Sequence, residues 1–181
     1  MATTMVPVVK KESRVRSLFA MLVSTRTGAL PADIALIATR IVLCWVFFYH
    51  GSRRLFGWFD GPGLNQSARY FADTAHLHPG KLFAVMGGAI EFFGAIALIL
   101  GVFSRLAGIA IFFDMMMAIV TVTWANGINA TGTKSGYELN LALGVLGLVI
   151  AMFGAGRFSV DALIERRLRP TDLRPAAPPP A

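Results

Sequence analysis

The side chains with the greatest capacity for chemistry are polar groups inside otherwise apolar stretches. Glu91 stands in the middle of residues 81–101, an apolar stretch long enough to cross a bilayer, since a crossing takes ~20 residues. A charge at the bilayer centre costs ~2.5–3.5 kcal/mol on insertion scales, and such groups usually face the interior of a helix bundle beside a partner. We therefore expect Glu91 to point inward and to have a polar partner elsewhere in the chain.

The helical neighbours of Glu91 support this orientation. At about 100° per residue, Gly87, Gly94 and Ala95 fall on its side of the helix, and bulky residues such as Phe93 fall on the other side. A second helix can approach a stripe of small residues closely, whereas the bulky face suits lipid.

Arg40, in the middle of the apolar stretch 31–51, is the expected partner of Glu91. A guanidinium stays charged and can bind a carboxylate through two hydrogen bonds. Two interpretations stay open. The pair either fixes the register of two helices or belongs to a polar site for a ligand or a proton.

A second carboxylate, Asp114, lies near the middle of residues 104–124. Its helical face carries the small residues Ala107 and Ala118, so it too is expected to point inward. Because Arg40 can neutralise only one of the two carboxylates, we expect the other to carry a proton much of the time at neutral pH.

The last apolar stretch, residues 137–153, adds one inward polar group. Asn140 shares a face with Gly144 and Gly147, so we expect it to point into the bundle. Glu138 lies on another side near the membrane interface, where a negative charge also favours the start of a helix.

The histidines and the cysteine predict no metal or redox site. A metal held by His76 and His78 would lack a third ligand, and His50 stands at a helix end rather than opposite another histidine. Cys44, the only cysteine, excludes an intramolecular disulfide and a CxxC pair. No haem, flavin, iron–sulfur or dinucleotide motif is visible, so we expect no resident cofactor of these kinds.

Composition indicates a membrane protein. Of the 181 residues, 55% are hydrophobic and 15% are charged, whereas soluble domains have ~25% charged residues. The net charge is +7, but the basic residues flank the apolar stretches, which is the topology signal of cytoplasmic loops. We therefore expect a lipid bilayer, and no nucleic acid, as the surroundings of the chain.

The apolar stretches divide the chain into one domain and two tails. We predict an all-α integral membrane four-helix bundle over residues 31–156. Its helices are expected at about 31–51, 81–101, 104–124 and 137–153, between a basic tail with an interfacial helix at 1–30 and a basic, Pro-rich tail at 157–181. Because Lys and Arg are more numerous on the side of the two tails, both termini are expected to be cytoplasmic.

Four motifs, in this order, resemble the DoxX family of small four-helix bacterial membrane proteins, a group of DoxX/MauE-like redox-associated proteins. The motifs are Arg40 followed by HGSRRLFGWFDGPG, the glycine-flanked Glu91, the turn LGVFSRL at Leu100–Leu106, and GYELNL at the start of the fourth helix. The resemblance covers about residues 34–161. Asp114 lies outside the family pattern, and the basic residue that precedes Leu-Phe-Gly in the family is Arg54 here.

The resemblance implies a multi-pass protein of the bacterial inner membrane with a link to redox enzymes. The family takes its name from a membrane subunit associated with thiosulfate:quinone oxidoreductase. Relatives are linked to the maturation of redox enzymes and to membrane complexes that handle thiol and oxidant stress. The motif positions carry over as a polar site without assigned catalytic roles, and they are Arg40, Glu91, Tyr137, Glu138 and Asn140.

The first hypothesis is a membrane subunit or anchor of a redox-associated complex. Its inward polar cluster, Asp114 included, would line a pocket for a quinone or a similar small molecule. Electrons would come from a protein partner such as an oxidoreductase, a sulfurtransferase or an oxidant-detoxifying enzyme. The chain alone would then catalyse nothing and would act as an accessory subunit of a quinone-linked oxidoreductase.

Two alternatives stay open beside it. One is a small proton-linked transporter, against which stand the short chain and the lack of an inverted repeat, although a homo-oligomer could compensate. The other is a structural membrane scaffold in which the ion pair only locks the bundle.

Overall fold

The computed structural model describes residues 30–129 and 135–168, which form helices and no strand, so the predicted all-α class is confirmed for these residues. In chain order the helical elements are α2 (Leu30–Phe56), α3 (Gly63–Asp73), α4 (Gly80–Leu100), α5 (Ser104–Ala118), the π-helical stretch Ile119–Thr123, the 3₁₀ turn Trp124–Asn126, α6 (Glu138–Phe153) and α7 (Val160–Leu168). The interfacial helix predicted within residues 1–30 lies outside the described residues.

Among the described residues, three helical segments are long and apolar enough to cross a membrane: α2, α4 and the segment Ser104–Asn126 that begins with α5. α6 is apolar but has 16 residues, or about 24 Å at 1.5 Å per residue, which is less than the ~30 Å hydrocarbon core. Large apolar side chains lie on the outside, with Trp45 80% and Val120 72% exposed, as a lipid-facing surface requires. A fourth crossing and the orientation of the termini stay predictions.

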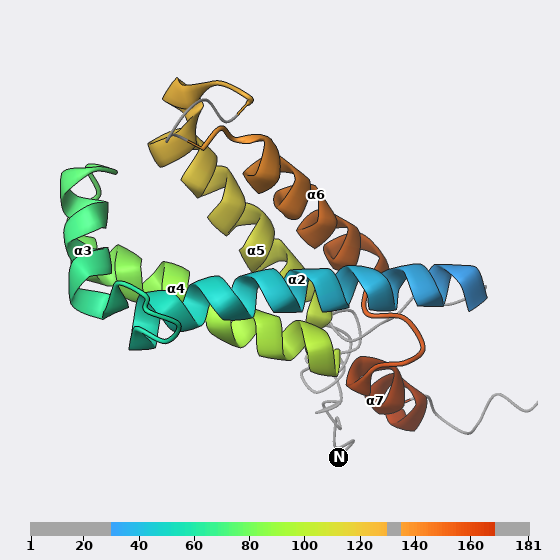
Figure 1. Cartoon of the computed structure of the whole chain (residues 1–181). Coiled ribbons are helices and arrows are strands. Elements are labelled where there is room, and N and C mark those ends of the chain that lie inside the picture. The colour runs from blue at the N-terminus through green and yellow to red at the C-terminus, as the bar shows by residue number, and fades with distance from the viewer. Residues whose placement is uncertain (1–29, 130–134, 169–181) are drawn as a thin grey trace, which may run out of the picture.

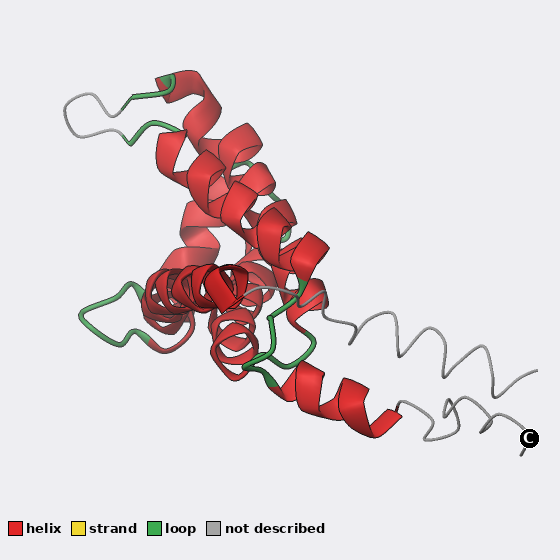
Figure 2. Ribbon diagram, turned by 90° about the vertical axis from the view of Figure 1, so that its right-hand side faces the viewer, coloured by secondary structure: helices red, strands yellow, loops and turns green. Residues whose placement is uncertain are grey.

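The helices form two pairs. α2 packs along α4, and α5 packs along α6. Figure 1 shows the pairs meeting near the short turn between α4 and α5 and spreading apart toward the end where α3 lies, and in Figure 2 α5 and α6 project away from the other pair. The core fills the region where the pairs meet, and its buried members are Leu36, Leu43, Phe47, Ala95, Leu98, Ala107, Ile111, Met115, Leu143 and Ile150. A closed four-helix bundle stays a prediction.

A close backbone contact sets the register of α2 against α4. A Cβ atom on Gly51 would lie 2.5 Å from the backbone nitrogen of Phe92 and 2.9 Å from its Cα, so a glycine is needed for this approach. The two helices run antiparallel (Figure 1), and the beginning of α2 therefore lies against the end of α4.

Arg40 joins three segments at that end. Its guanidinium donates hydrogen bonds to the carbonyl oxygens of Leu98 (2.7 Å) and Ile99 (2.7 Å) in the last turn of α4. It also donates to the carbonyl oxygens of Ala155 (3.0 Å) and Phe158 (2.8 Å), which follow α6. The last carbonyls of a helix have no partner within the helix, so a cation placed there satisfies them.

Two buried carboxylates complete the same end. Asp161, in the first turn of α7, accepts hydrogen bonds from the backbone N–H groups of Phe103 (2.8 Å) and Ser104 (2.9 Å), and so caps the start of α5. Asp33 accepts from the backbone N–H of Arg157 (2.9 Å) and pairs with its Nε (2.7 Å). Part of the predicted tail 157–181 is thus a helix that is bound to the rest of the domain.

Candidate functional site

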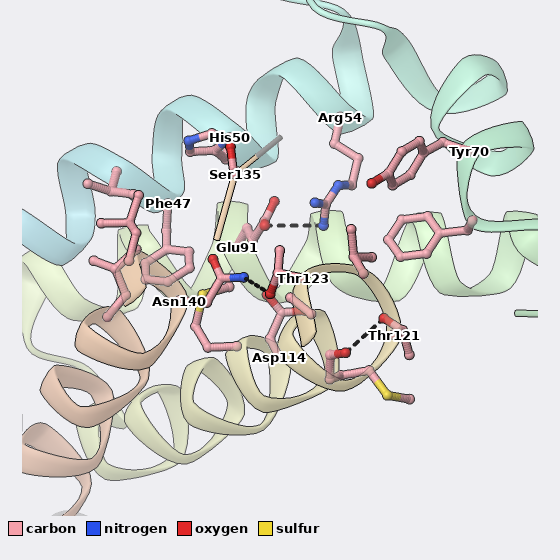
Figure 3. A pocket seen from close by; sticks show the side chains of 18 of the residues that line it. Phe47, His50, Arg54, Tyr70, Glu91, Asp114, Thr121, Thr123, Ser135 and Asn140 are labelled. Atoms are coloured by element: carbon pink, nitrogen blue, oxygen red, sulfur yellow. Dashed lines mark hydrogen bonds and ion pairs between the residues drawn. The ribbon is translucent and has the colours of Figure 1, made fainter. Parts of the chain in front are cut away.

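A pocket of about 300 Å³ lies where the two helix pairs begin to diverge, within the size range of small-molecule sites. Side chains from α2, α3, α4, α5 and α6 line it, together with the π-helical stretch and residues 135–136. Figure 3 shows polar groups from these elements facing one another across the pocket.

An ion pair forms the centre of this polar wall. Arg54, in the last turn of α2, places Nη1 at 3.1 Å from Oε1 of Glu91 in the middle of α4 (Figure 3). Glu91 is 3% exposed, and its Oε2 has no hydrogen-bond partner among the described residues. A buried acceptor without a partner costs about 1–3 kcal/mol, so Oε2 is an atom that a bound donor would stabilise.

Asp114 brings a second carboxylate to the same guanidinium. A Cβ atom on Gly87 would lie 2.8 Å from Arg54 Nη1 and 3.5 Å from Asp114 Oδ1, so both groups lie close to the open side of this glycine. Any larger residue at position 87 would fill the space in front of the guanidinium. Arg54 also stacks over the ring of Phe71, with 5.2 Å from its guanidinium carbon to the ring centroid. The guanidinium of Arg54 therefore lies close to the carboxylates of both Glu91 and Asp114.

The opposite wall is polar but uncharged. Asn140 in α6 donates from Nδ2 to Oγ1 of Thr123, at 3.3 Å, and both residues line the pocket. Thr123 ends the π-helical stretch, in which the wider turn rotates the following side chains relative to an α-helix. Such turns occur frequently at functional sites.

These groups define what the pocket can bind. Arg54 offers hydrogen-bond donors and a positive charge, whereas Glu91 and Asp114 offer acceptors or, when protonated, donors. Apolar side chains of Phe47, Met115 and other residues make up the rest of the wall. A mostly apolar molecule with polar groups at its rim matches this lining.

The structure brings together three of the residues predicted to form the site: Glu91, Asp114 and Asn140. Tyr137 and Glu138 precede Asn140 by three and two residues in the chain but do not line the pocket. Tyr137 stacks on Trp124, with 5.7 Å between ring centroids, and Glu138 is exposed.

The prediction that Arg40 pairs with Glu91 was wrong. Arg40 binds backbone carbonyls at Leu98 and Ile99, about 10 Å farther along α4 than Glu91 at 1.5 Å per residue. The contact between Gly51 and Phe92 explains why, because it places the last turn of α2, rather than its middle, beside Glu91.

Arg54 was missed because the first helix was expected to end at Gly51. α2 continues to Phe56 and leaves the helical conformation only at Gly57, whose φ of +72° suits glycine. The signal was present in the sequence: Arg53 and Arg54 favour the last turn of a helix, where basic side chains meet the negative end of the helix dipole.

Comparison with protein-family models matches residues 35–124 to the DoxX family. This range holds Arg54, Glu91 and Asp114 and ends before α6. No curated protein and no solved structure matches the chain. The matched range covers most of each of the three helical segments that are able to cross a bilayer among the described residues. The chain therefore belongs to the DoxX family and is a membrane protein of that family.

Proposed function

We propose that this protein is a membrane subunit or anchor of a redox-associated complex and that its pocket binds the head group of a quinone. The observation that carries the proposal is the pair of Arg54 with the buried Glu91 at a largely apolar pocket of about 300 Å³, where one carboxylate oxygen has no hydrogen-bond partner among the described residues. Buried ionisable groups in membrane helices usually serve substrates or protons.

Quinone chemistry suits these side chains. A quinone carbonyl accepts hydrogen bonds, which Arg54 can donate, and a quinol hydroxyl donates, which Oε2 of Glu91 can accept. Reduction of a quinone to a quinol consumes two electrons and two protons. The electrons would come from the redox partner protein, and Glu91 and Asp114 would relay the two protons to the quinone oxygens.

The partner is part of the proposal. We expect an oxidoreductase, a sulfurtransferase or an oxidant-detoxifying enzyme to bind this chain at the bacterial inner membrane, with both termini of the chain in the cytoplasm. Purification of the tagged protein from its own membranes in mild detergent, followed by mass spectrometry, tests this. A stoichiometric redox enzyme supports the subunit role, and a homo-oligomer without partners contradicts it.

The pocket itself is tested by binding of decylubiquinone to the purified protein in nanodiscs. Hydrogen bonds to charged groups are worth ~1.5–3 kcal/mol, so Glu91→Gln and Arg54→Met should each weaken binding at least tenfold. Asp73→Asn is the control, because Asp73 is an exposed carboxylate of α3 outside the pocket. Circular dichroism confirms that each variant keeps its helices. An unchanged affinity for decylubiquinone in both pocket variants would refute the quinone proposal.

A second candidate, a proton-linked transporter, is favoured by one observation: two carboxylates share one guanidinium. Protonophore-sensitive uptake of a solute into proteoliposomes would support it. If Glu91→Gln abolished such uptake while quinone binding were absent from the wild-type protein, transport would replace the quinone proposal.

A further inference from the structure

A second hollow lies at the other end of the molecule, well away from the pocket of Glu91. It is an open groove of about 720 Å³ between the end of α4 and the beginning of α7. The two elements are joined there by the backbone hydrogen bond from Asp161 N–H to the Gly101 carbonyl, 2.9 Å long. Figure 1 shows α7 beside this end of the helix pairs.

The charge of this groove is positive. Arg40, Arg157 and Arg166 line it, and none of the residues that line it is an Asp or Glu. Arg40 is held by four neutral carbonyl oxygens, and Asp161 offsets part of its charge without a hydrogen bond to it among the described residues. Asp33 offsets Arg157, whose side chain is still 44% exposed, and Arg166 is exposed on α7. The groove therefore keeps a net positive charge and suits an anion.

The remaining lining is apolar and faces outward. Leu100 at the end of α4 is 54% exposed, and Phe158 and Leu163 are each 56% exposed. α4 ends at Leu100 and the next apolar helix begins at Ser104, so this edge lies where the chain leaves the bilayer. On α7, the exposed apolar side chain of Leu163 lies one helical turn before Arg166 and Arg167, and such a neighbourhood of apolar and basic side chains suits a membrane interface.

We propose that this groove binds the head group of an anionic phospholipid, with the phosphate between Arg157 and Arg166 and the acyl chains along Leu100 and Leu163. A free anion would use the arginines but would leave the exposed apolar side chains in water. A phospholipid covers both, because its charge and its hydrocarbon meet at the depth at which the groove lies. The inference does not depend on the quinone proposal.

The test is native mass spectrometry of the full chain with added phosphatidylglycerol or phosphatidylcholine. The wild-type protein should bind phosphatidylglycerol more tightly. Arg166→Gln should weaken this binding about fivefold, the factor that corresponds to about 1 kcal/mol for a basic residue near an anionic surface. Arg167→Gln is the matched control, since it removes the same charge one residue away, outside the groove. It should change the affinity less than twofold.

Three results would overturn the proposal. Equal affinity for the two lipids would show that the groove does not select an anionic head group, and equal losses in Arg166→Gln and Arg167→Gln would show that only general surface charge matters. Inorganic phosphate separates the two sources of the anion: at millimolar concentration it should leave the lipid bound. If it displaces phosphatidylglycerol, the groove is a site for soluble phosphate. Both arginines are exposed, so neither variant is expected to disturb the fold.

Discussion

Which arginine stabilises Glu91 can be decided by two double-mutant cycles. In the structure, Arg54 lies 3.1 Å from the carboxylate, and Arg40 is bound to carbonyls about 10 Å farther along α4. The first cycle combines Arg54→Gln with Glu91→Gln, and the second combines Arg40→Gln with Glu91→Gln. Arg40 is a stringent control, because this residue is also buried and charged.

The magnitudes follow from burial. Arg54→Gln leaves a carboxylate that is 3% exposed without its cation, and removal of one partner of a buried ion pair costs about 3–5 kcal/mol. Arg54 is 26% exposed on its side chain, so Glu91→Gln should cost less, about 1–3 kcal/mol. The double variant has no uncompensated charge. Its loss of stability should therefore be smaller than the sum of the two single losses by about 1–3 kcal/mol.

For Arg40 the expectation is additivity. Arg40→Gln removes hydrogen bonds to four carbonyl oxygens and destabilises the protein. The loss of stability in the double variant should equal the sum of the two single losses within about 0.5 kcal/mol. The assay is the free energy of reversible unfolding in mixed detergent micelles, followed by circular dichroism. A coupling of Glu91 to Arg40 that equals or exceeds its coupling to Arg54 would refute the assignment of the pair.

Three further predictions concern packing and the end where the helix pairs meet. Gly51→Ala should destabilise the protein by several kcal/mol, because the new Cβ would lie 2.5 Å from the Phe92 backbone. Gly94→Ala should stabilise it by up to ~1 kcal/mol, because its Cβ would lie 3.5 Å from the nearest side-chain atom and alanine favours a helix. Thermal unfolding of the two variants measures both effects. Asp161→Ala should cost about 1–2 kcal/mol through loss of the cap on α5, and amide exchange at Ser104 should rise; unchanged exchange would contradict the capping role. Asp33→Asn should weaken the attachment of residue 157 and the following helix, so trypsin should cut that helix faster than in the wild-type protein, and an unchanged rate would argue against this attachment.

The sequence carried most of the helical organisation. Apolar stretches of about 20 residues placed α4 within one residue of its bounds, and the glycines around Glu91 indicated that it points inward, where the structure places it. Asp114 and Asn140 were found in the same way, from small residues on their own helical faces. The inward face of a helix can therefore be predicted from the sequence of that helix alone.

The relation between helices could not be predicted in the same way. Arg40 and Glu91 both stand near the middle of their stretches, but the antiparallel register depends on which glycine lies against which backbone. Several glycines could have made that contact, and the structure uses Gly51 against Phe92. α2 also extends past this glycine, and only this extension brings Arg54 to the carboxylate. Register and helix length are set by tertiary packing, which no single stretch encodes.

The end at which Arg40, Asp33 and Asp161 join the helices has a mechanical consequence. Charged hydrogen bonds hold that end, whereas the helix pairs spread apart at the other (Figure 1). Under a pulling force across the membrane, the protein should therefore yield first near α3 and last at the turn between α4 and α5. We therefore expect a partner that docks beside α3 to meet a more compliant surface than one that docks on α7.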